Sequence, residues 1–188
     1  MIKGVFIDFF DVIAPGALTN WVEREGLSIS EELLKISARS DIGDIDGESY
    51  FKEAAEILGV DYDNLLRDIT QNEAVNQDVV SLIDTLGENY QVVLITNSSS
   101  DYLRHMLERF DLERRFDHIL VSAEIGMTKP NLDIFQTALE VAGLSPEEAV
   151  FIDDRKENVD GAKALGIHGI VFEDVETLKY RLEELGVL

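Results

Sequence analysis

"VFIDFFDVIAPG", residues 5–16, is the stretch that decides the fold, because an apolar run ends there on a carboxylate. The run "VFI" has the length and the residue types of a short buried strand, and Asp8 follows it directly. Two phenylalanines then separate Asp8 from a second acid, Asp11. An acid at this place is either a turn or cap residue or part of a functional site, and the rest of the chain distinguishes the two interpretations.

Four more short apolar runs have the character of buried strands. They are "VVLI" before Thr96, "ILV" before Ser122, "AVFI" before Asp153 and "GIVF" at residues 169–172. Between the later runs, apolar residues recur with helical spacing at 103, 106, 107 and 110 and at 134, 135, 138, 139 and 142, and after the last run they recur at 175, 178, 182 and 185. Continuously apolar strands that alternate with helices are typical of parallel sheets. We therefore predict an α/β fold, a Rossmann-like parallel sheet with helices on both faces.

The segment between the first two strands differs, since it contains helical spacing and no convincing strand. Its helical stretches are "ISEELLKISARS" at 29–40, "GESYFKEAAEILG" at 47–59 and "DYDNLLRDIT" at 61–70. Ser30 and Asp46 are the N-caps that we expect for the first two. We predict a small helical bundle inserted after the first strand, with a cap domain at residues 14–74 and a core domain at residues 1–13 and 75–188.

The composition excludes several classes of function. The 188 residues carry a formal net charge of −22, which argues against nucleic acid and anionic membranes as partners. The chain has no cysteine, which excludes disulfides and thiolate sites. No apolar run approaches the ~20 residues of a membrane span, and no signal-peptide pattern precedes the first strand, so we expect a cytoplasmic protein. An anionic substrate would need local positive charge from a lysine, helix N-termini or a metal ion.

Polar residues stand where four of the five apolar runs end. They are Asp8, Thr96, Ser122 and Asp153. In an open parallel sheet, ligands bind beyond the carboxyl ends of the strands. The sequence therefore predicts a functional site at this edge of the sheet.

Three further motifs add groups to that edge. They are "TNSSSD" at 96–101, "TKPNLDIF" at 128–135 and "IDDRKEN" at 152–158. The first is typical of a helix start, with Ser99 or Ser100 as the cap. The second places Lys129 before Pro130, which we expect at the first position of a helix. The third has two adjacent acids, an arrangement that is costly unless a cation or hydrogen-bond donors neutralise it.

The order of these motifs (strand-Asp, strand-Thr-Asn, Lys-Pro-helix, strand-Asp-Asp) resembles the haloacid dehalogenase superfamily. The long stretch from "SAEIGMTKPNLDIF" to "GIHGIVF" and the segment "GDIDGESYFKEAAEILG" resemble its small-capped, magnesium-dependent phosphatases, which act on sugar phosphates and similar metabolites. The resemblance extends over essentially the whole chain. It implies an enzyme that hydrolyses a small phosphorylated metabolite.

The resemblance implies a nucleophile and a metal site. Asp8 would take the phosphoryl group as an aspartyl-phosphate, which splits one hard displacement into two easier ones. Mg²⁺ would be held by Asp8, the backbone carbonyl of Phe10 and the adjacent acids, with water and substrate oxygens completing the octahedron. Asp154 would be the direct ligand, and Asp153 would act through a water molecule.

The same resemblance implies a phosphate-binding set. The Thr96 hydroxyl and the Asn97 amide would bind phosphate oxygens, and Lys129 would stabilise their charge and that of Asp8. Asn158, one helical turn after the paired acids, would hold the loop or touch the substrate. This set supplies the local positive charge that an acidic chain needs to bind an anion.

The chain departs from the family's usual loop, which has Asp, any residue, Asp, Gly, then Thr or Val. Phe10 replaces the second Asp, which normally protonates the leaving group, and Asp11 replaces the Gly. Loss of such acid–base help commonly costs ~10²–10⁴-fold in rate. Asp11 is either a substitute acid or a residue chosen because Asp tolerates a left-handed turn, and we favour the turn.

Three functions stay open at this point. The first is a phosphatase with another acid, or with a leaving group that needs little protonation. The second is a metal-independent 2-haloacid dehalogenase, since that sister group has an aromatic residue at this position. The third is a weakly active or non-catalytic relative that binds a phosphorylated ligand. The adjacent acids of the "IDDRKEN" motif favour the metal-dependent phosphatase.

Overall fold

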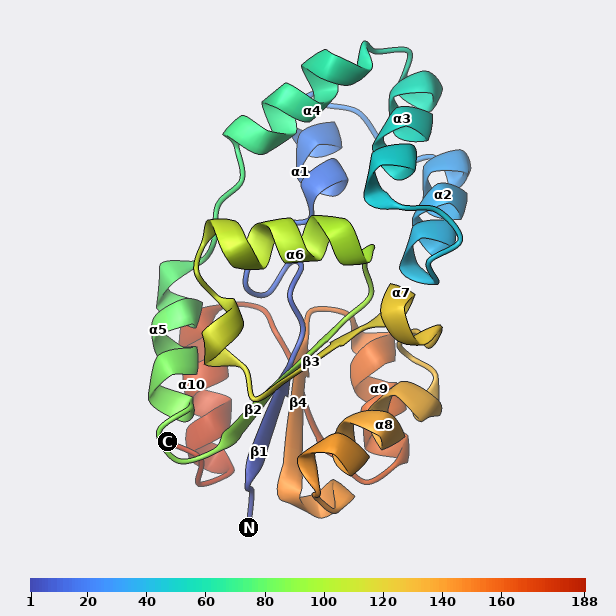
Figure 1. Cartoon of the computed structure of the whole chain (residues 1–188). Coiled ribbons are helices and arrows are strands. Elements are labelled where there is room, and N and C mark those ends of the chain that lie inside the picture. Colours follow the sequence, from blue (N-terminus) through green and yellow to red (C-terminus); the bar gives the residue numbers. More distant parts are fainter.

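A five-stranded sheet forms the centre of the computed structural model, which describes all 188 residues (Figure 1). The strands are β1 (Gly4–Ile7), β2 (Gln91–Thr96), β3 (His118–Val121), β4 (Ala149–Asp153) and β5 (His168–Val171). Their order in the sheet is β3-β2-β1-β4-β5, and every neighbouring pair is parallel. All five predicted strands are present, and the predicted α/β fold is confirmed.

The two faces of the sheet belong to two separate hydrophobic clusters. Val5 and Ile7 of β1 share a cluster with buried residues of α5 (Gln77–Leu86), α6 (Ser100–Arg109) and α10 (Val175–Glu184). Phe6, between them, belongs to the cluster of α8 (Leu132–Ala142) and α9 (Lys156–Ala164). Because successive side chains of a strand point to opposite faces, both faces are apolar and both are covered by helices.

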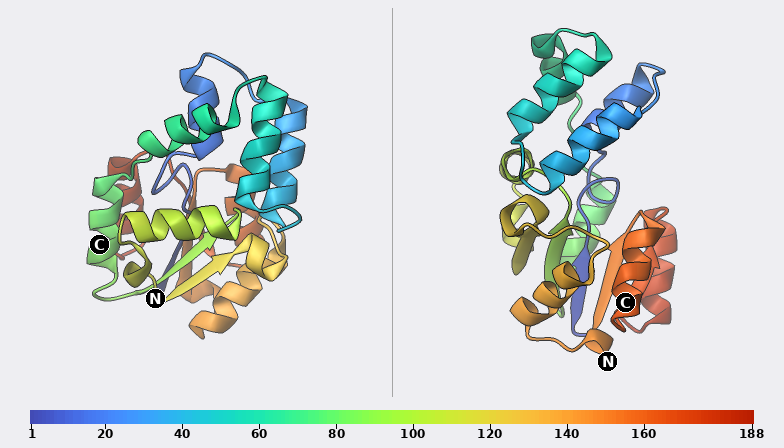
Figure 2. Two further views of the ribbon diagram at one scale, coloured as in Figure 1. Left: turned by 45° about the horizontal axis from the view of Figure 1, so that its top comes forward. Right: turned by 90° about the vertical axis from the view of Figure 1, so that its right-hand side faces the viewer.

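Four helices lie together beyond the carboxyl ends of the strands (Figures 1 and 2). They are α1 (Ala17–Arg24), α2 (Glu31–Asp41), α3 (Gly47–Leu58) and α4 (Tyr62–Gln71). These helices have a hydrophobic cluster of their own, in which Trp21 and Phe51 are buried. The spacing predicts α2, α3 and α4 but does not resolve α1 as a separate helix. We retain residues 14–74 as the proposed extent of this cap, and 1–13 and 75–188 as that of the core.

The cap helices begin where the sequence predicts. The Ser30 hydroxyl accepts a hydrogen bond from the Leu33 N–H at 3.3 Å, and the Asp46 carboxylate accepts one from the Ser49 N–H at 2.8 Å. Each bond satisfies one of the free N–H groups in a first helical turn. Ser99 occupies the N-cap position of α6, but its side chain makes no capping hydrogen bond.

The predicted start of α8 is wrong. The sequence places Pro130 at the first helical position, whereas α8 begins at Leu132 with Asn131 as its N-cap residue. The Asn131 N–H donates instead to the Thr128 carbonyl at 2.9 Å and closes a turn. This turn holds Lys129 and Pro130 ahead of the helix, where the lysine side chain reaches the end of the sheet.

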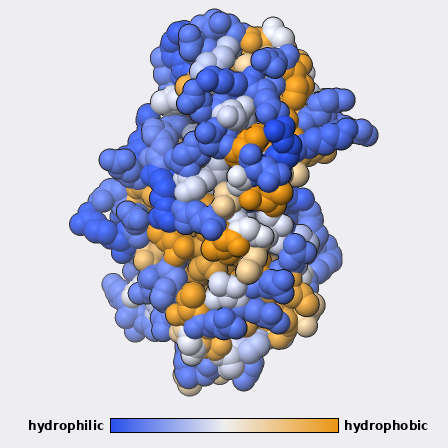
Figure 3. All heavy atoms as spheres, turned by 45° about the vertical axis from the view of Figure 1, so that its right-hand side comes forward, coloured by the Kyte–Doolittle hydropathy of each residue, from blue (hydrophilic) through white to orange (hydrophobic).

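Hydrophilic residues cover most of the face drawn in Figure 3, and apolar residues form smaller patches between them. Such a surface agrees with the formal net charge of −22. None of the helices combines the length and the apolar character that a membrane crossing requires.

Candidate active site

Polar residues meet at the carboxyl ends of three neighbouring strands. Asp8 follows β1, Thr96 ends β2 and Asp153 ends β4. Ile7 pairs with Ile152 in the parallel register, and the Asp8 N–H donates to the Ile152 carbonyl at 2.9 Å. This register sets the two aspartates beside each other, so the sheet itself assembles the residues that sequence reasoning selected.

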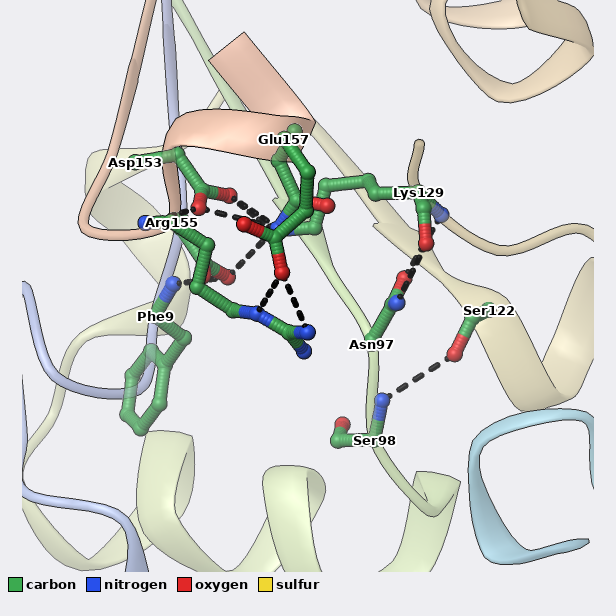
Figure 4. A network of polar contacts seen from close by, with 10 residues as sticks. Phe9, Asn97, Ser98, Ser122, Lys129, Asp153, Arg155 and Glu157 are labelled. Carbon is green, nitrogen blue, oxygen red and sulfur yellow. Dashed lines mark hydrogen bonds and ion pairs between the residues drawn. The ribbon is translucent and has the colours of Figure 1, made fainter. Parts of the chain in front are cut away.

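Lys129 lies buried between two carboxylates (Figure 4). Its Nζ is 2.7 Å from Asp8 Oδ1 and 2.6 Å from Asp153 Oδ2, and its side chain is only 1% exposed. A lysine is rarely buried to this degree unless it is paired. The turn before α8 brings this residue to the centre of the site, a position that the motif alone does not specify.

Asp153 has every side-chain oxygen engaged by the protein. Oδ1 accepts the Arg155 N–H and the Asn158 Nδ2–H, both at 2.9 Å, and Oδ2 accepts Asn158 Nδ2 at 3.1 Å besides Lys129. Buried polar groups in folded proteins are generally hydrogen-bonded in this way. Asn158 therefore holds the loop through Asp153, which is one of the two roles expected for it.

Asp8 and Asp154 are less well compensated. Burial raises the pKa of Asp8 to about 7 even though Lys129 opposes the shift. Burial also raises the pKa of Asp154 to about 6, with Asp153 and Asp11 adding to the effect. Asp154 has no ion-pair partner. Only Asp8 of these two has a cation in contact with it, and burial still raises the pKa of both carboxyls.

The acids at the site fit a divalent cation. Asp8, Asp153 and Asp154 each offer a carboxylate oxygen, and these oxygens lie within 4.8 Å of one another. Lys129 neutralises only part of their charge, and no backbone N–H donates to the nearby carbonyl of Phe10. Carboxylate and carbonyl oxygens are the ligands that Mg²⁺ prefers, and a cation here would offset the unfavourable charge.

A cavity of about 240 Å³ lies between these residues and the cap. The core residues that line it include Asp8, Phe10, Asp11, Asn97, Lys129, Asp154 and Asn158. The cap lines it with Leu33, Ser37, Asp41, Tyr50 and Phe51, among others. The helical insert thus forms one wall of the cavity, and the strand ends form the other.

Thr96 and Asn97 differ in how much of their polar groups remains available. The Thr96 hydroxyl is buried and has no hydrogen-bond partner. The side-chain amide of Asn97 donates to the Lys129 carbonyl at 3.0 Å and accepts the Lys129 N–H at 2.9 Å (Figure 4). Asn97 therefore fixes the backbone that carries the lysine, and its side chain is committed to that contact.

Ser122 is a positioning residue to which sequence reasoning gave no role. Its hydroxyl accepts the Ser98 N–H at 3.0 Å, which ties the loop after β2 to the start of α7 (Ser122–Ile125) (Figure 4). Its place at the end of a strand was the only signal in the sequence, and strands end on polar residues for several reasons.

Phe10 is part of an aromatic wall that continues into the cap. Its ring stacks on Tyr102 with centroids 6.0 Å apart and planes 13° apart, and it meets Phe9 edge-on at 4.9 Å. Tyr102 in turn meets Phe51 of α3 edge-on at 5.3 Å. The position at which the resemblance implies an acid is apolar here, and its ring is partly buried and lines the cavity.

Asp11 has the left-handed conformation that the turn interpretation predicts, with φ of 60°. Its Oδ1 accepts the Gly16 N–H at 2.9 Å, at the point where the chain enters α1. A Cβ at Gly16 would lie 3.2 Å from Asp11 Oδ2, so the glycine allows this close approach. Asp11 therefore shapes the turn into the cap, and one of its carboxylate oxygens is committed to it.

A family model described as haloacid dehalogenase-like hydrolase matches residues 21–172. The chain belongs to this haloacid dehalogenase-like hydrolase family. The parallel sheet with helices on both faces is the fold that the resemblance in the sequence implies.

Several solved structures and curated proteins resemble the chain to different extents. An HAD family enzyme from Bacteroides thetaiotaomicron, solved with magnesium and inorganic phosphate, aligns with a TM-score of 0.75 and 25% identity, over 95% of this chain and 99% of that one. A phosphorylated carbohydrates phosphatase from Thermotoga maritima is 28% identical over 79% of this chain and 62% of its own length. The drimenol cyclase of Aspergillus calidoustus is 26% identical over 98% of this chain. The chain spans only 37% of the length of that cyclase.

The stability of this haloacid dehalogenase-like hydrolase is expected to fall as the pH rises from 5 to 8 in the presence of a chelator. Burial raises the pKa of Asp8 to about 7, and those of Asp154 and Asp41 to about 6. The folded chain keeps these protons at pH values where the unfolded chain has lost them, so their contribution to stability is lost as the pH passes the folded pKa. Thermal unfolding at each pH measures the effect, and a flat or rising melting temperature would contradict it.

Proposed function

We propose that this chain is a Mg²⁺-dependent phosphomonoester hydrolase that acts on a small phosphorylated metabolite, such as a sugar phosphate, through an aspartyl-phosphate on Asp8. The observation that carries the proposal is the buried Lys129, which bridges Asp8 and Asp153 at the base of a cavity. The magnesium and phosphate in the Bacteroides relative, and the carbohydrate phosphatase of Thermotoga, support it.

The Asp8 carboxylate has one oxygen held and one free. Oδ1 accepts the Phe9 N–H at 2.7 Å and lies 2.7 Å from Lys129 Nζ, while Oδ2 takes no hydrogen bond from the protein. We assign Oδ2 as the oxygen that attacks phosphorus. Lys129 favours the ionised form of Asp8 and stabilises the charge that gathers on the phosphoryl oxygens.

Asp8, Asp154 and the Phe10 carbonyl would hold Mg²⁺ directly, and Asp153 would hold it through water. Bound there, the ion would neutralise phosphate charge and so let an anionic nucleophile approach an anionic substrate. The engagement of Asp153 by Lys129, Asn158 and Arg155 supports its indirect place. The lack of an ion-pair partner at Asp154 supports its direct one.

Thr96 and Asn97 complete the phosphate site in this proposal. The Thr96 hydroxyl has no hydrogen-bond partner in the protein, so it is free to donate to a phosphate oxygen, which is a strong acceptor. Asn97 acts through its backbone N–H and through the lysine that its side chain fixes, because its side-chain amide is already engaged.

Two other functions compete with this one. A metal-independent dehalogenase would agree with the aromatic Phe10, but it would give no role to the half-buried Asp154, which has no ion-pair partner. A ligand-binding relative would agree with the loss of the usual acid but needs no oriented nucleophile. The free Oδ2 of Asp8 and the acidic cluster favour hydrolysis of a phosphate ester over both.

Release of inorganic phosphate from p-nitrophenyl phosphate and a panel of sugar phosphates tests the proposal. We expect turnover in millimolar Mg²⁺ that is abolished by a chelator and restored when Mg²⁺ is returned. Halide release from a 2-haloacid, measured in parallel with chelator present, reports the dehalogenase. The proposal would be contradicted if the chelator did not lower the rate of phosphate release, or if no substrate released phosphate.

A further inference from the structure

Asp41, the last residue of α2, lies at the cap side of the active-site cavity. The C-terminal end of α2 points from the cap towards the core, above α7 (Figures 1 and 2). Asp41 lines the same cavity as Asp8, Lys129 and Phe10. Sequence reasoning selected no acid in this part of the chain.

Two contacts anchor this end of α2 on the core. Gly43 has φ of 80°, and a Cβ there would lie 2.7 Å from the Ala123 carbonyl oxygen, so the loop after α2 packs directly on α7. The Gly47 N–H donates to both carboxylate oxygens of Asp101 in α6, each at 3.0 Å. With the loop fixed on both sides, the position of Asp41 over the strand ends is set by the fold.

The carboxyl of Asp41 has no partner in the protein. It takes part in none of the side-chain hydrogen bonds or ion pairs of the chain, although it is half-buried. Its place at a helix C-terminus is itself unfavourable for a negative charge. A half-buried acid with no structural contact, facing the cavity, is available to a ligand.

The groups that face Asp41 leave it able to hold a proton near neutrality. Burial raises its pKa to about 6, and Arg155 and Lys129 of the core oppose the shift. Lys129 is engaged by two carboxylates and Arg155 by Glu157. On the cap side the Tyr50 hydroxyl pairs with Ser37 at 3.2 Å. A carboxyl that titrates near the working pH is suited to proton transfer in both directions.

We propose that Asp41 supplies, from the cap, the proton transfers that Phe10 cannot make. As Asp8 Oδ2 bonds to phosphorus and the ester P–O bond breaks, protonated Asp41 gives its proton to the leaving oxygen, which keeps the electron pair of that bond. Its carboxylate then takes a proton from the water that attacks the aspartyl-phosphate. This step frees inorganic phosphate and the Asp8 carboxylate and reprotonates Asp41. The inference rests on the proposed function.

Asp41→Asn tests the proposal through the chemistry of the leaving group. On glycerol phosphate, whose alkoxide needs a proton, we expect kcat to fall by about 10²–10⁴-fold with KM little changed. On p-nitrophenyl phosphate, whose leaving group needs none, we expect a rapid burst of one equivalent of nitrophenolate followed by slow turnover. The burst appears because Asp8 is still phosphorylated, while hydrolysis of the aspartyl-phosphate lacks its base.

Three further variants keep the outcome interpretable. Asp44→Asn removes an exposed acid from the same loop and is expected to leave both substrates unaffected. Phe10→Asp, added to Asp41→Asn, is expected to restore part of the rate on glycerol phosphate, which no structural role of Asp41 predicts. Asp11→Asn preserves the turn and removes the competing carboxyl.

Each contrary result has a distinct meaning. A selective loss on glycerol phosphate in Asp11→Asn, with none in Asp41→Asn, would assign the acid to Asp11 and overturn the inference. A rise in KM alone in Asp41→Asn, equal for both substrates, would make Asp41 a substrate-binding residue and overturn it too. A wild-type protein without Mg²⁺-dependent turnover would instead reject the proposed function and this inference with it.

Discussion

Asp8→Asn is expected to lower phosphate release by at least about 10⁴-fold, because a neutral amide oxygen does not attack phosphorus and loss of a nucleophile is among the costliest changes in an enzyme. Asparagine keeps an oxygen that can accept the Phe9 N–H, which donates to Asp8 Oδ1 at 2.7 Å in the native chain. The shape of the loop is therefore retained while its reactivity is lost. Steady-state kcat on the best substrate in saturating Mg²⁺ measures the effect.

The same variant is expected to be more stable than the native chain at pH 8 in chelator. Burial raises the pKa of Asp8 to about 7, so this buried carboxyl is mostly ionised in the native fold at pH 8. Its negative charge then lowers the free energy of unfolding. Asparagine removes that charge, and Lys129 keeps its ion pair with Asp153 at 2.6 Å. We expect the melting temperature to rise by about 2–4 °C for each kcal/mol recovered.

Opposite changes in activity and stability separate a chemical role from a structural one. A variant that is inactive and also melts earlier would indicate that Asp8 acts through the fold of its loop. Turnover that survives in Asp8→Asn would place the nucleophile elsewhere and remove the basis of the proposed mechanism.

The strands and the centre of the site follow from local features of the sequence. Short apolar runs identify buried strands, and the carboxyl ends of parallel strands lie at the same edge of a sheet. The proximity of Asp8, Thr96 and Asp153 is therefore predictable from the sequence alone. Lys129 joins them in the sequence only through the resemblance to a family. In the structure, its pairing with two buried carboxylates supplies the physical reason.

Other features depend on packing between distant segments, which a single sequence does not display. The start of α8 at Leu132 depends on a turn that is closed by the Asn131 N–H. The commitment of the Asn97 side chain to the backbone of Lys129 requires two loops to meet. Asp41 is one among 38 acidic residues. Only its place on the wall of the cavity between the cap and the core distinguishes it from the others.

Lys129→Ala is expected to destabilise the metal-free protein by about 3–5 kcal/mol at pH 8, because it leaves buried carboxylates without their cation. Lys129 Nζ lies 2.7 Å from Asp8 and 2.6 Å from Asp153, and the lysine side chain is 1% exposed. This loss corresponds to a fall in melting temperature of about 6–20 °C. Phosphate release is expected to be lost in the same variant, since Asp8 loses the neighbouring charge that favours its ionised form.

The conditions of the measurement distinguish an uncompensated charge from a packing defect. Millimolar Mg²⁺, or a pH of 5 at which Asp8 keeps its proton, is expected to restore much of the lost stability, because each removes negative charge from the same place. Lys52→Ala is the matched control: its ion pair with Glu48, at 2.5 Å, is exposed, so its melting temperature is expected to stay nearly unchanged. A loss in Lys129→Ala that neither Mg²⁺ nor acid reduces would show that the lysine stabilises the fold by filling space and not by its charge.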